Sequence, residues 1–268
     1  MYPILSSDVL RKLEAASRSG SAHTEATLDL GISKMKLDLD TAGFFVEGKH
    51  VDFIKLRPDD KSCYVVVDGA LQKVQFSSPE TGFIYKLVPT SFRPILQTSG
   101  TPMHKMEFIA RVEKDKLAGK VLDAGTGLGY TAIAASRTAE QVITVEIDKT
   151  IIEVARLNPY SQALFKSKNI NLIIDDLSEK IKGFRDSEFD FIILDVGNQR
   201  IFADFFSGEN YRQAYRVLKS GGKLYHYIPQ PQVTRGRDFT AEVMKRIKAA
   251  GFSDIERVEK DSYIVATK

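Results

Sequence analysis

The stretch 120–130, which reads KVLDAGTGLGY, constrains the fold more than any other part of this sequence. An apolar run typical of a strand ends in Asp123, three alternating glycines follow, and a helical composition continues from 131. Strand, glycine loop and helix form the opening unit of a doubly wound α/β sheet, whose ligand lies beyond the carboxyl end of that strand. Glycine lets the backbone turn tightly and approach a ligand, and a helix start offers free N–H groups. The loop alone does not identify the ligand, because many nucleotide-binding folds have one.

Composition sets the broad class of protein. With 268 residues, of which 43% are hydrophobic, the chain can bury one good core and carry a smaller second unit. The net charge of +3 comes from intermixed charges of both signs and does not indicate nucleic-acid binding. The single cysteine, Cys63, excludes an intramolecular disulfide and fits a reducing compartment. No apolar run approaches the roughly 20 residues that span a bilayer, and the start lacks signal-peptide order, so we expect a cytoplasmic protein without membrane contact.

The first 90 residues are expected to form a small N-terminal domain, a short helix followed by an antiparallel β unit. Alternation of apolar and polar residues and turn dipeptides support the β unit. The expected elements are a helix over 4–18 capped by Ser7, strands over 27–30 and 35–39, and hairpin turns at 47–48 and 68–69, the second with arms over 63–67 and 72–76.

A second interpretation makes residues 10–33 a helix-turn-helix with the hairpin near Gly48 as a wing. The segment 30–33, Leu-Gly-Ile-Ser, resembles the turn before a recognition helix. Residues 34–40 alternate at period two, however, which a recognition helix does not do. We therefore do not expect DNA binding.

Residues 91–118 are interpreted as a connecting segment. Prolines and a glycine over 89–102 indicate a linker, and 103–116 a helix that leads into the sheet. His104 at the start of this helix either reaches the ligand or is a surface or packing residue, and the second alternative is favoured.

The remaining residues, 119–268, alternate between strand and helix, which implies a parallel sheet. Gly221 and Gly222 are expected to end a helix. The expected strands are 119–124, 141–147, 169–175, 189–195 and 222–228, and the expected helices are 129–138, 149–166 (broken at 158–159), 177–183, 209–219 and 240–250.

The C-terminal end departs from a plain parallel sheet. Two extended runs, 252–259 and 262–267, are separated by two residues. A parallel crossover needs a much longer connection, so these runs must form an antiparallel hairpin. The last strand therefore enters the sheet reversed.

The glycine loop together with the reversed last strand resembles the class I methyltransferases that use S-adenosylmethionine. The resemblance implies a Rossmann-like α/β fold with an antiparallel last strand, and S-adenosylmethionine as cofactor. It implies that Glu146, 17 residues past Gly129, accepts from both ribose hydroxyls and that Ile147 packs on adenine. Asp176, or Asp175 as second choice, would accept from the adenine amino group. The implied cofactor residues are Asp123, Gly125, Thr126, Gly127, Gly129, Tyr130, Glu146, Ile147, Asp175, Asp176, Leu177 and Asp195.

Other interpretations of these positions remain. A single strand-end acid is usually a helix cap, and three glycines alone form a tight turn. A nicotinamide dehydrogenase needs a small residue at the sixth position of its loop, where this chain has Tyr130. The bulky phenol and the terminal hairpin argue against that class.

The whole chain also resembles a group of predicted archaeal methyltransferases. The matching stretches are 85–90, 103–105, 127–132, 158–161 and 221–227. That group has an Asp-Pro-Pro-Arg-Phe type loop after the fourth strand, where this chain reads Asp195-Val-Gly-Asn-Gln-Arg200. Amino-group methyltransferases hold the target nitrogen with an (Asp/Asn)-Pro-Pro-aromatic loop, so its absence speaks against a nucleobase or amide-nitrogen target.

An aminopropyltransferase such as a spermidine synthase is the main alternative activity. Residues 146–156 are similar to the second-strand region of those enzymes, which also carry a small N-terminal β unit. They use decarboxylated S-adenosylmethionine, and Asp195 would help to take the proton of the acceptor amine. Their usual loop, Gly-Gly-Gly-x-Gly, differs from Asp123-Ala-Gly-Thr-Gly127 here. Methyl transfer is therefore preferred, and a binding protein without catalysis is the third hypothesis.

Two residues are candidates for a catalytic base, if the reaction uses one. Asp195 and His226 each lie near a strand end that faces the rim formed by 195–204 and 226–235. His226 is equally compatible with a buried strand position, and Tyr225 and Tyr227 must point to the opposite face. No metal is expected, a homodimer is one open assembly, and the acceptor (small molecule, protein or RNA) is not defined by the sequence.

Overall fold

The computed structural model describes residues 2–103, 106–196, 203–228, 238–258 and 262–268. Contacts between residues divide the chain into two compact units. The first contains Met1–Met103 and Thr150–Gln162, and the second contains His104–Lys149 and Ala163–Lys268. The domain boundaries expected from the sequence, at 90 and 118, stay a prediction.

The first unit contains the twelve-residue helix α1 (Ser7–Arg18), helical segments within 150–162, and small antiparallel sheets. Its apolar core gathers Leu10 and Leu13 of α1 with Phe44 and Val51 of a hairpin, all buried. The strands are β1 (Ile4–Ser6), β2 (His23–Ala26), β3 (Met35–Asp38), β4 (Gly43–Val46), β5 (Lys49–Asp52), β6 (Cys63–Val67), β7 (Ala70–Lys73), β8 (Gln75–Ser77), β9 (Ile84–Val88), β10 (Ile95–Thr98) and β11 (Thr101–Pro102).

The first helix starts later than the sequence predicts. Ile4 to Ser6 pair with β6 as a strand, and the Ser6 side chain accepts a hydrogen bond from the Val9 N–H at 3.2 Å. Ser6 is therefore the N-cap, and Ser7, predicted as the cap, lies inside the helix. Strand pairing, a long-range contact, decided the boundary.

Both predicted hairpin turns of the β unit are confirmed. Glu47-Gly48 and Asp68-Gly69 have positive φ at both positions, 50° and 77° in the first turn and 49° and 79° in the second. That backbone matches the type I′ turn, whose twist suits the flanking strands. The second hairpin pairs 64–67 with 70–73, so the arm predicted over 72–76 is shifted.

The predicted strand over 27–30 is wrong. β2 lies just before it and pairs with β3, while the Thr27 hydroxyl donates to Asp29 at 2.7 Å and accepts from the Gly31 N–H. These side-chain bonds compete with strand pairing and form a local turn. The helix-turn-helix alternative is also wrong, because 35–38 is extended.

The predicted linker over 89–102 is only partly a linker. β10 pairs antiparallel with β9, and β11 with β10. Pro94 precedes β10 and Pro102 ends the edge strand β11, where a missing N–H removes no ladder bond. Proline content alone therefore overstated the break.

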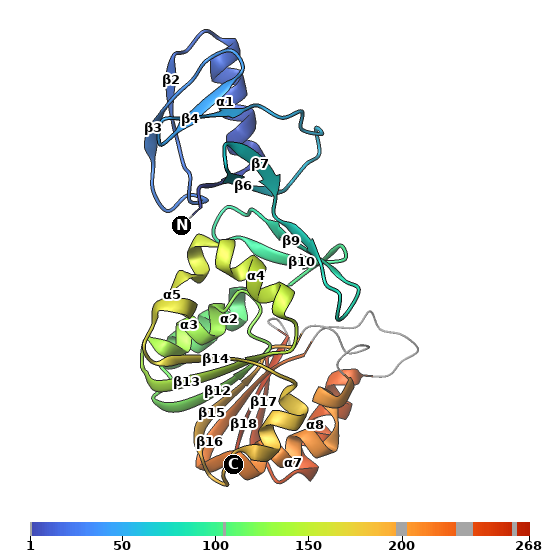
Figure 1. The fold of residues 1–268 in the computed structure, drawn as a ribbon. Coiled ribbons are helices and arrows are strands. Elements are labelled where there is room, and N and C mark those ends of the chain that lie inside the picture. The colour runs from blue at the N-terminus through green and yellow to red at the C-terminus, as the bar shows by residue number, and fades with distance from the viewer. Residues whose placement is uncertain (1, 104–105, 197–202, 229–237, 259–261) are drawn as a thin grey trace. The chain divides into compact units, whose positions relative to one another are not determined.

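The second unit is built on one sheet with the strand order β14-β13-β12-β15-β16-β18-β17 (Figure 1). The five neighbouring strands β14, β13, β12, β15 and β16 pair in parallel. Strand β18 runs antiparallel to both β16 and β17. This arrangement confirms the α/β class and the reversed last strand. The strands are β12 (Gly119–Ala124), β13 (Ala139–Glu146), β14 (Ile170–Ile174), β15 (Phe189–Leu194), β16 (Leu218–Tyr227), β17 (Ser253–Val258) and β18 (Tyr263–Thr267).

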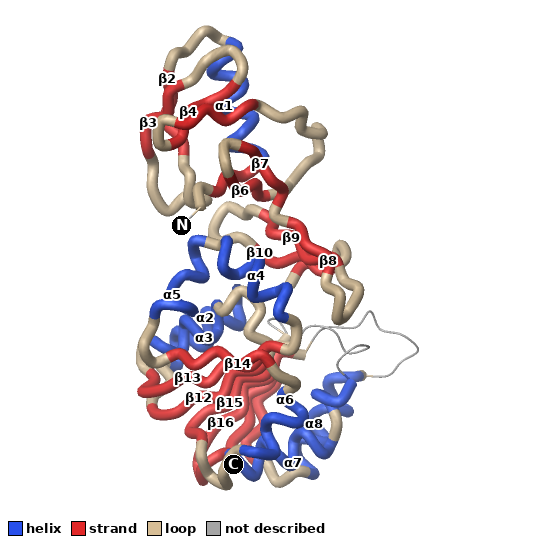
Figure 2. The backbone as a smooth tube through the Cα atoms, viewed as in Figure 1, coloured by secondary structure: helices blue, strands red, loops and turns tan. Residues whose placement is uncertain are grey.

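Helices cover both faces of this sheet (Figure 2). On one face, Phe108 of α2 (Met106–Asp115) packs against Tyr227 and Tyr263. On the other, a buried cluster joins Leu194 of the sheet to Tyr211 of α7 (Gly208–Val217) and Val243 of α8 (Phe239–Ala249). The other helices among the described residues are α3 (Tyr130–Ser136), α4 (Lys149–Leu157), η1 (Pro159–Ser161), α5 (Gln162–Lys166), α6 (Leu177–Lys180), η2 (Ile181–Gly183) and η3 (Ala203–Phe206). The gap between α4 and η1 confirms the break predicted at 158–159.

Gly221 and Gly222 do not end a helix as predicted. α7 ends at Val217, and both glycines lie in β16, where the pairing with β15 jumps from Leu218 to Lys223. A Cβ on Gly222 would lie 2.9 Å from the Asp190 carbonyl oxygen. A close backbone approach at a strand irregularity therefore explains this glycine.

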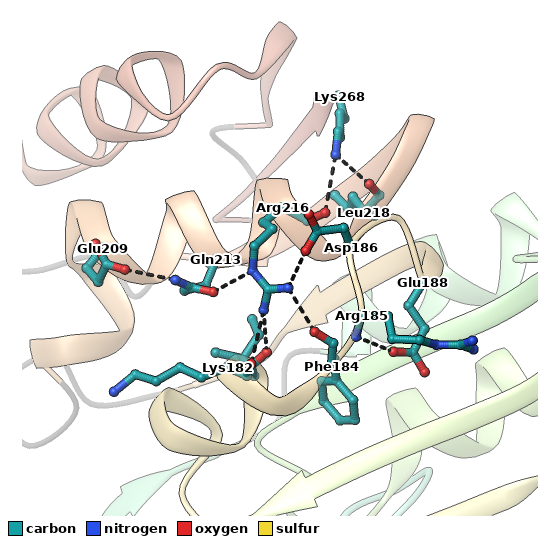
Figure 3. Close-up of polar contacts among 11 residues, drawn as sticks. Lys182, Phe184, Arg185, Asp186, Glu188, Glu209, Gln213, Arg216, Leu218 and Lys268 are labelled. Carbon is teal, nitrogen blue, oxygen red and sulfur yellow. Dashed lines mark hydrogen bonds and ion pairs between the residues drawn. The ribbon is translucent and has the colours of Figure 1, made fainter.

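A polar cluster stabilises the edge where β15 begins (Figure 3). The Arg216 guanidinium donates to the carbonyl oxygens of Ile181 and Phe184 at 3.0 and 2.8 Å, and to Asp186 at 2.6 Å. It thereby satisfies carbonyl groups at the end of η2. This cluster lies at the amino-terminal edge of β15, away from the strand end where a ligand is expected.

Candidate active site

The glycine loop leaves β12 in a conformation that requires glycine. Gly125, Gly127 and Gly129 have φ of 79°, 57° and 79°. The Gly125 N–H donates to the Val145 carbonyl at 3.0 Å, and the Gly129 N–H to the Thr126 carbonyl at 2.7 Å. The loop is therefore fixed against the end of β13 before α3 begins.

Glu146 ends β13 and is tied to the same loop. Its Oε2 accepts from the Gly127 N–H at 2.9 Å, and its Oε1 accepts from Ile147 and Asp148 N–H groups at 3.0 and 3.2 Å. Burial raises the pKa of Glu146 to about 7, against the effect of these hydrogen bonds. A carboxylate oxygen accepts two hydrogen bonds, so Oε2 keeps capacity for a further donor.

Asp123 lies in a buried chain of hydroxyl groups. Thr144 Oγ1 donates to Asp123 Oδ2 at 2.6 Å and lies 2.6 Å from Thr126 Oγ1. Oδ1 of Asp123 is buried and has no hydrogen-bond partner among the described residues. Burial raises the pKa of Asp123 to about 6, and the Thr144 hydroxyl, with the nearby Thr131, acts in the opposite direction.

Asp195 follows β15 and is half-buried. Its N–H donates to the Ala124 carbonyl at 2.9 Å, which fixes it beside the glycine loop. Burial, and then the negative charge of Asp123, raise the pKa of Asp195 to about 7. A carboxyl group with such a pKa is suited to accept a proton near neutral pH.

The acids after β14 have local roles in this structure. Asp176 is the N-cap of α6 and accepts from the Ser178 N–H at 2.8 Å, while Asp175 accepts from the Asp176 N–H at 2.9 Å. Asp176 therefore caps a helix, as the alternative interpretation of this acid expected, and its contact with adenine stays a prediction. Leu177 is buried behind the cap.

Two exposed isoleucines lie at neighbouring strand ends. Glu146 pairs with Ile174 across β13 and β14, and Ile147 follows directly. The exposed fraction is 41% for Ile147 and 47% for Ile174, which is high for large apolar side chains. They form an apolar surface next to the Glu146 carboxylate.

Strand register places the acids on one face of the sheet. Asp123 is opposite Thr144 on β13 and Ile193 on β15, and residues that pair directly point to the same side. Glu146 and Asp195 lie two residues further along their strands, so they share this face. The predicted cofactor residues Asp123, Glu146 and Asp195 are thus brought together.

His226 points to the other face. It is fully buried, its Nδ1 donates to the Leu194 carbonyl at 3.2 Å, and its Nε2 accepts from the Tyr211 hydroxyl at 2.9 Å. The ring also stacks on Phe206 at 5.1 Å. Burial lowers the pKa of His226 to about 4, so the imidazole is neutral. This is the buried strand position of the second interpretation, and the catalytic role stays a prediction that the geometry does not favour.

Sequence reasoning missed Thr144 as a residue of this face, and it placed Tyr227 opposite His226 without giving it a role. Leu194 pairs with His226, so Tyr227 lies beside Asp195, where the negative charge of Asp195 adds to burial in raising the pKa of Tyr227 to about 12. The Tyr227 hydroxyl makes no hydrogen bond with a described residue, whereas that of Tyr225 donates to Asp115. The sequence signal that could have found Thr144 is its position two residues before Glu146, since residues at this spacing in a strand share a face.

Some predicted site residues lie outside the part of the chain that the structure describes. His104 and most of the predicted rim, 197–202 and 229–235, lie outside the described residues. Tyr130 is buried at the start of α3. In the part of the chain that the structure describes, no group of three or more His, Cys, Asp or Glu residues could hold a metal, and no helix is long and apolar enough to cross a membrane.

Fold and site together define a class of protein. A sheet of this order, with a reversed last strand, a glycine loop and acids at the ends of β12, β13 and β15, is that of the class I S-adenosylmethionine-dependent methyltransferases. The sequence profile described as "Methyltransferase domain" matches residues 121–222. This match covers the glycine loop together with Asp123, Glu146 and Asp195.

The family can be stated more closely. The chain is 38% identical over 224 residues to the uncharacterized protein MJ1233 of Methanocaldococcus jannaschii, covering 80% of this chain and 76% of that protein. The chain belongs to the same family as this archaeal protein.

Aminopropyltransferases are more distant relatives. The polyamine aminopropyltransferase of Thermococcus onnurineus is 34% identical over 110 residues, 38% of each chain. The Mycobacterium tuberculosis enzyme of that name is 26% identical over 139 residues, and the match spans only 26% of its length. The spermidine synthase of Thermotoga maritima shares the fold, with a TM-score of 0.58 and 21% identity over 69% of each chain. The likeness to the Thermotoga maritima structure shows the fold alone, whereas the methyltransferase-domain match and the aminopropyltransferase relatives support a transferase of one of these two types.

Proposed function

We propose that this protein is an S-adenosylmethionine-dependent methyltransferase. The observation that carries the proposal is the buried Asp123 carboxylate beside the glycine loop. Its Oδ1 lacks a hydrogen-bond partner among the described residues, and a buried carboxylate oxygen without a donor is costly. A cationic ligand group that binds there would remove this cost.

The residues present fit an adenosyl donor. The carboxylate of Glu146 has capacity for a ribose hydroxyl, as its Oε2 accepts one hydrogen bond. The exposed Ile147 and Ile174 provide an apolar surface for a purine. Gly125 and Gly129 leave no room for a Cβ, since one would lie 2.4 Å from the Asp195 carbonyl oxygen and 2.8 Å from Leu164, respectively. Asp123 Oδ1 would accept from the ammonium group of the donor.

The bound donor supplies a methyl group activated by a sulfonium centre. The loop and Glu146 orient it, and alignment accounts for much of the acceleration in such a displacement. Asp195, with a pKa raised to about 7, would hold the proton that a nucleophile releases. Tyr227 lies beside Asp195, and we propose that both face the acceptor.

Aminopropyl transfer is the second candidate. The similarity to polyamine aminopropyltransferases covers 38% of this chain at 34% identity in the Thermococcus onnurineus protein. Both reactions use an adenosyl donor with an ammonium group, so the face formed by Asp123 and Glu146 serves either. The two donors differ by one carboxylate.

Isothermal titration calorimetry separates the candidates. S-adenosylmethionine and S-adenosylhomocysteine are expected to bind with micromolar affinity, and decarboxylated S-adenosylmethionine at least tenfold more weakly. Preference for the decarboxylated donor would instead support aminopropyl transfer, and binding of none of the three would refute both. The acceptor is then sought with methyl-labelled donor in small-molecule, protein and RNA fractions.

A further inference from the structure

Thr144 holds a central place in a chain of three buried side chains. Asp123, Thr126 and Thr144 are all at most 1% exposed. A carboxylate only accepts, so the Thr144 hydroxyl donates its single hydrogen to Asp123 Oδ2. The 2.6 Å contact between the two hydroxyls is then a hydrogen bond from Thr126 to Thr144. The chain runs in one direction, from the glycine loop through β13 to the carboxylate on β12.

A hydroxyl at this position is not needed for packing. The neighbouring residues of β13, Val142, Ile143 and Val145, are buried and apolar. Valine has nearly the shape of threonine, and a buried hydroxyl is costly unless it is hydrogen-bonded. The bonds to Thr126 and Asp123 offset that cost, and they connect two residues of the candidate donor site.

The chain of bonds also determines which carboxylate oxygen is left available. With Oδ2 engaged by Thr144, Oδ1 is the oxygen of Asp123 without a hydrogen-bond partner among the described residues. The Thr131 hydroxyl also lies near this carboxylate and lowers its pKa, so it assists Thr144. A hydrogen bond to the ionised form also favours ionisation of a buried acid. Both effects prepare Asp123 for a cationic group.

We infer that Thr144 is a positioning residue for the donor: it orients Asp123 and keeps it ionised, so that Oδ1 binds the ammonium group of the adenosyl donor. This inference rests on the proposed function and holds equally for methyl and aminopropyl transfer. Thr144 acts through Asp123 and does not itself contact the donor.

The test compares donor affinity in Thr144→Val, Thr144→Ser and wild type by calorimetry from pH 5.5 to 8.5. Thr144→Val is expected to weaken donor binding about tenfold at pH 7, in line with the loss of one hydrogen bond to a charged group, and Thr144→Ser to restore it. Glu146 and Asp195 face the same site, have pKa values raised to about 7 and titrate in every variant, so the comparison between variants is what reports on Asp123. The pH below which affinity falls should be higher in Thr144→Val than in wild type, because the pKa of Asp123 rises without its donor. A purely structural role would not shift this pH.

Two further variants complete the design. Thr126→Val removes only the outer bond and should weaken binding less, about threefold. Thr240→Val, at a buried threonine of α8, should leave affinity at the wild-type value. In an Asp123→Asn background, Thr144→Val should have no additional effect, because its influence passes through the carboxylate.

The outcomes separate the two proposals. If wild type binds no adenosyl donor, the proposed function fails. If wild type binds but Thr144→Val keeps the same affinity and pH profile, the inference on Thr144 is overturned alone. Should Thr144→Val fail to fold, Thr144→Cys is compared with Thr144→Ser: both lack the γ-methyl group, and the thiol is the weaker donor. An affinity of Thr144→Cys equal to that of Thr144→Ser at pH 6 would overturn the inference as well.

Discussion

Gly125 and Asp195 are in backbone contact: a Cβ on Gly125 would lie 2.4 Å from the carbonyl oxygen of Asp195 and 3.1 Å from its carbonyl carbon. The backbones just after the carboxyl ends of β12 and β15 are therefore in close contact. This contact brings Asp195 beside the glycine loop and sets the spacing between the proposed donor and acceptor sides.

Gly125→Ala is expected to be more destabilising than a glycine substitution at a similar φ elsewhere. Gly221 is the matched control, because its φ is 75° and a Cβ there would meet no atom of a described residue beyond its chain neighbours within 4 Å. Gly221→Ala should cost about 1 kcal/mol from backbone strain alone, and Gly125→Ala about 3 kcal/mol or more because the backbone must also shift. Urea unfolding measures both. Equal costs would show that the contact with Asp195 is unimportant.

Glu146→Ala is expected to abolish donor binding, because it removes the proposed ribose contact and releases the Gly127 N–H. Glu146→Gln keeps an amide oxygen that can accept from one side, so a loss of about tenfold to a hundredfold is expected. Calorimetry with S-adenosylmethionine gives both values, and thermal unfolding controls for the fold. Unchanged affinity in Glu146→Ala would argue strongly against the assigned site.

Transfer should depend on the ionisation of Asp195. If Asp195 takes the proton, kcat/KM rises as pH increases through about 7, the raised pKa of this group in the ligand-free protein. Asp195→Asn should lower kcat about a hundredfold and remove this dependence. Asp123→Asn removes a neighbouring negative charge, so the pKa of Asp195 falls and the rise should move to lower pH. A wild-type profile in Asp195→Asn would exclude it as the base.

Burial of neutral His226 should make stability depend on pH in a defined direction. Its folded-state pKa of about 4 lies below the ordinary value of 6.5, so the unfolded state binds the proton first. The contribution of His226 is complete above pH 6.5 and is lost as pH falls toward about 4, on the order of 3 kcal/mol in total.

The measurement is the free energy of unfolding of wild type minus that of His226→Gln between pH 4 and 8. The difference cancels the opposite contribution of Asp123, Glu146 and Asp195, whose raised pKa values favour the folded state as pH falls. A difference independent of pH would show that His226 is not buried as a neutral ring.

Tyr211→Phe should cost about 1 to 3 kcal/mol of unfolding free energy at pH 7, because Nε2 of His226 loses its hydrogen-bond donor.

Much of the site was predictable because it depends on local sequence. Asp123, the glycines and Glu146 follow one another over short distances in the sequence. Each of the two acids comes where an apolar run stops, which places it at a strand end. The errors have a different origin. Ser6 became the cap because β1 pairs with β6, and Gly222 belongs to β16 because the Asp190 backbone approaches it. Both are contacts between residues far apart in the chain.

The sequence by itself determined the fold class, the glycine loop and the reversed last strand, because periodicity, turn residues and connection length act within a few residues of one another. Only the tertiary structure decided which side chains of neighbouring strands share a face. Parallel pairing of β15 with β16 sets Asp195 beside Tyr227 and turns His226 to the opposite side, and the pairing of β12 with β13 brings Thr144 to Asp123. Register between strands depends on how the whole core packs, and no single segment contains that information.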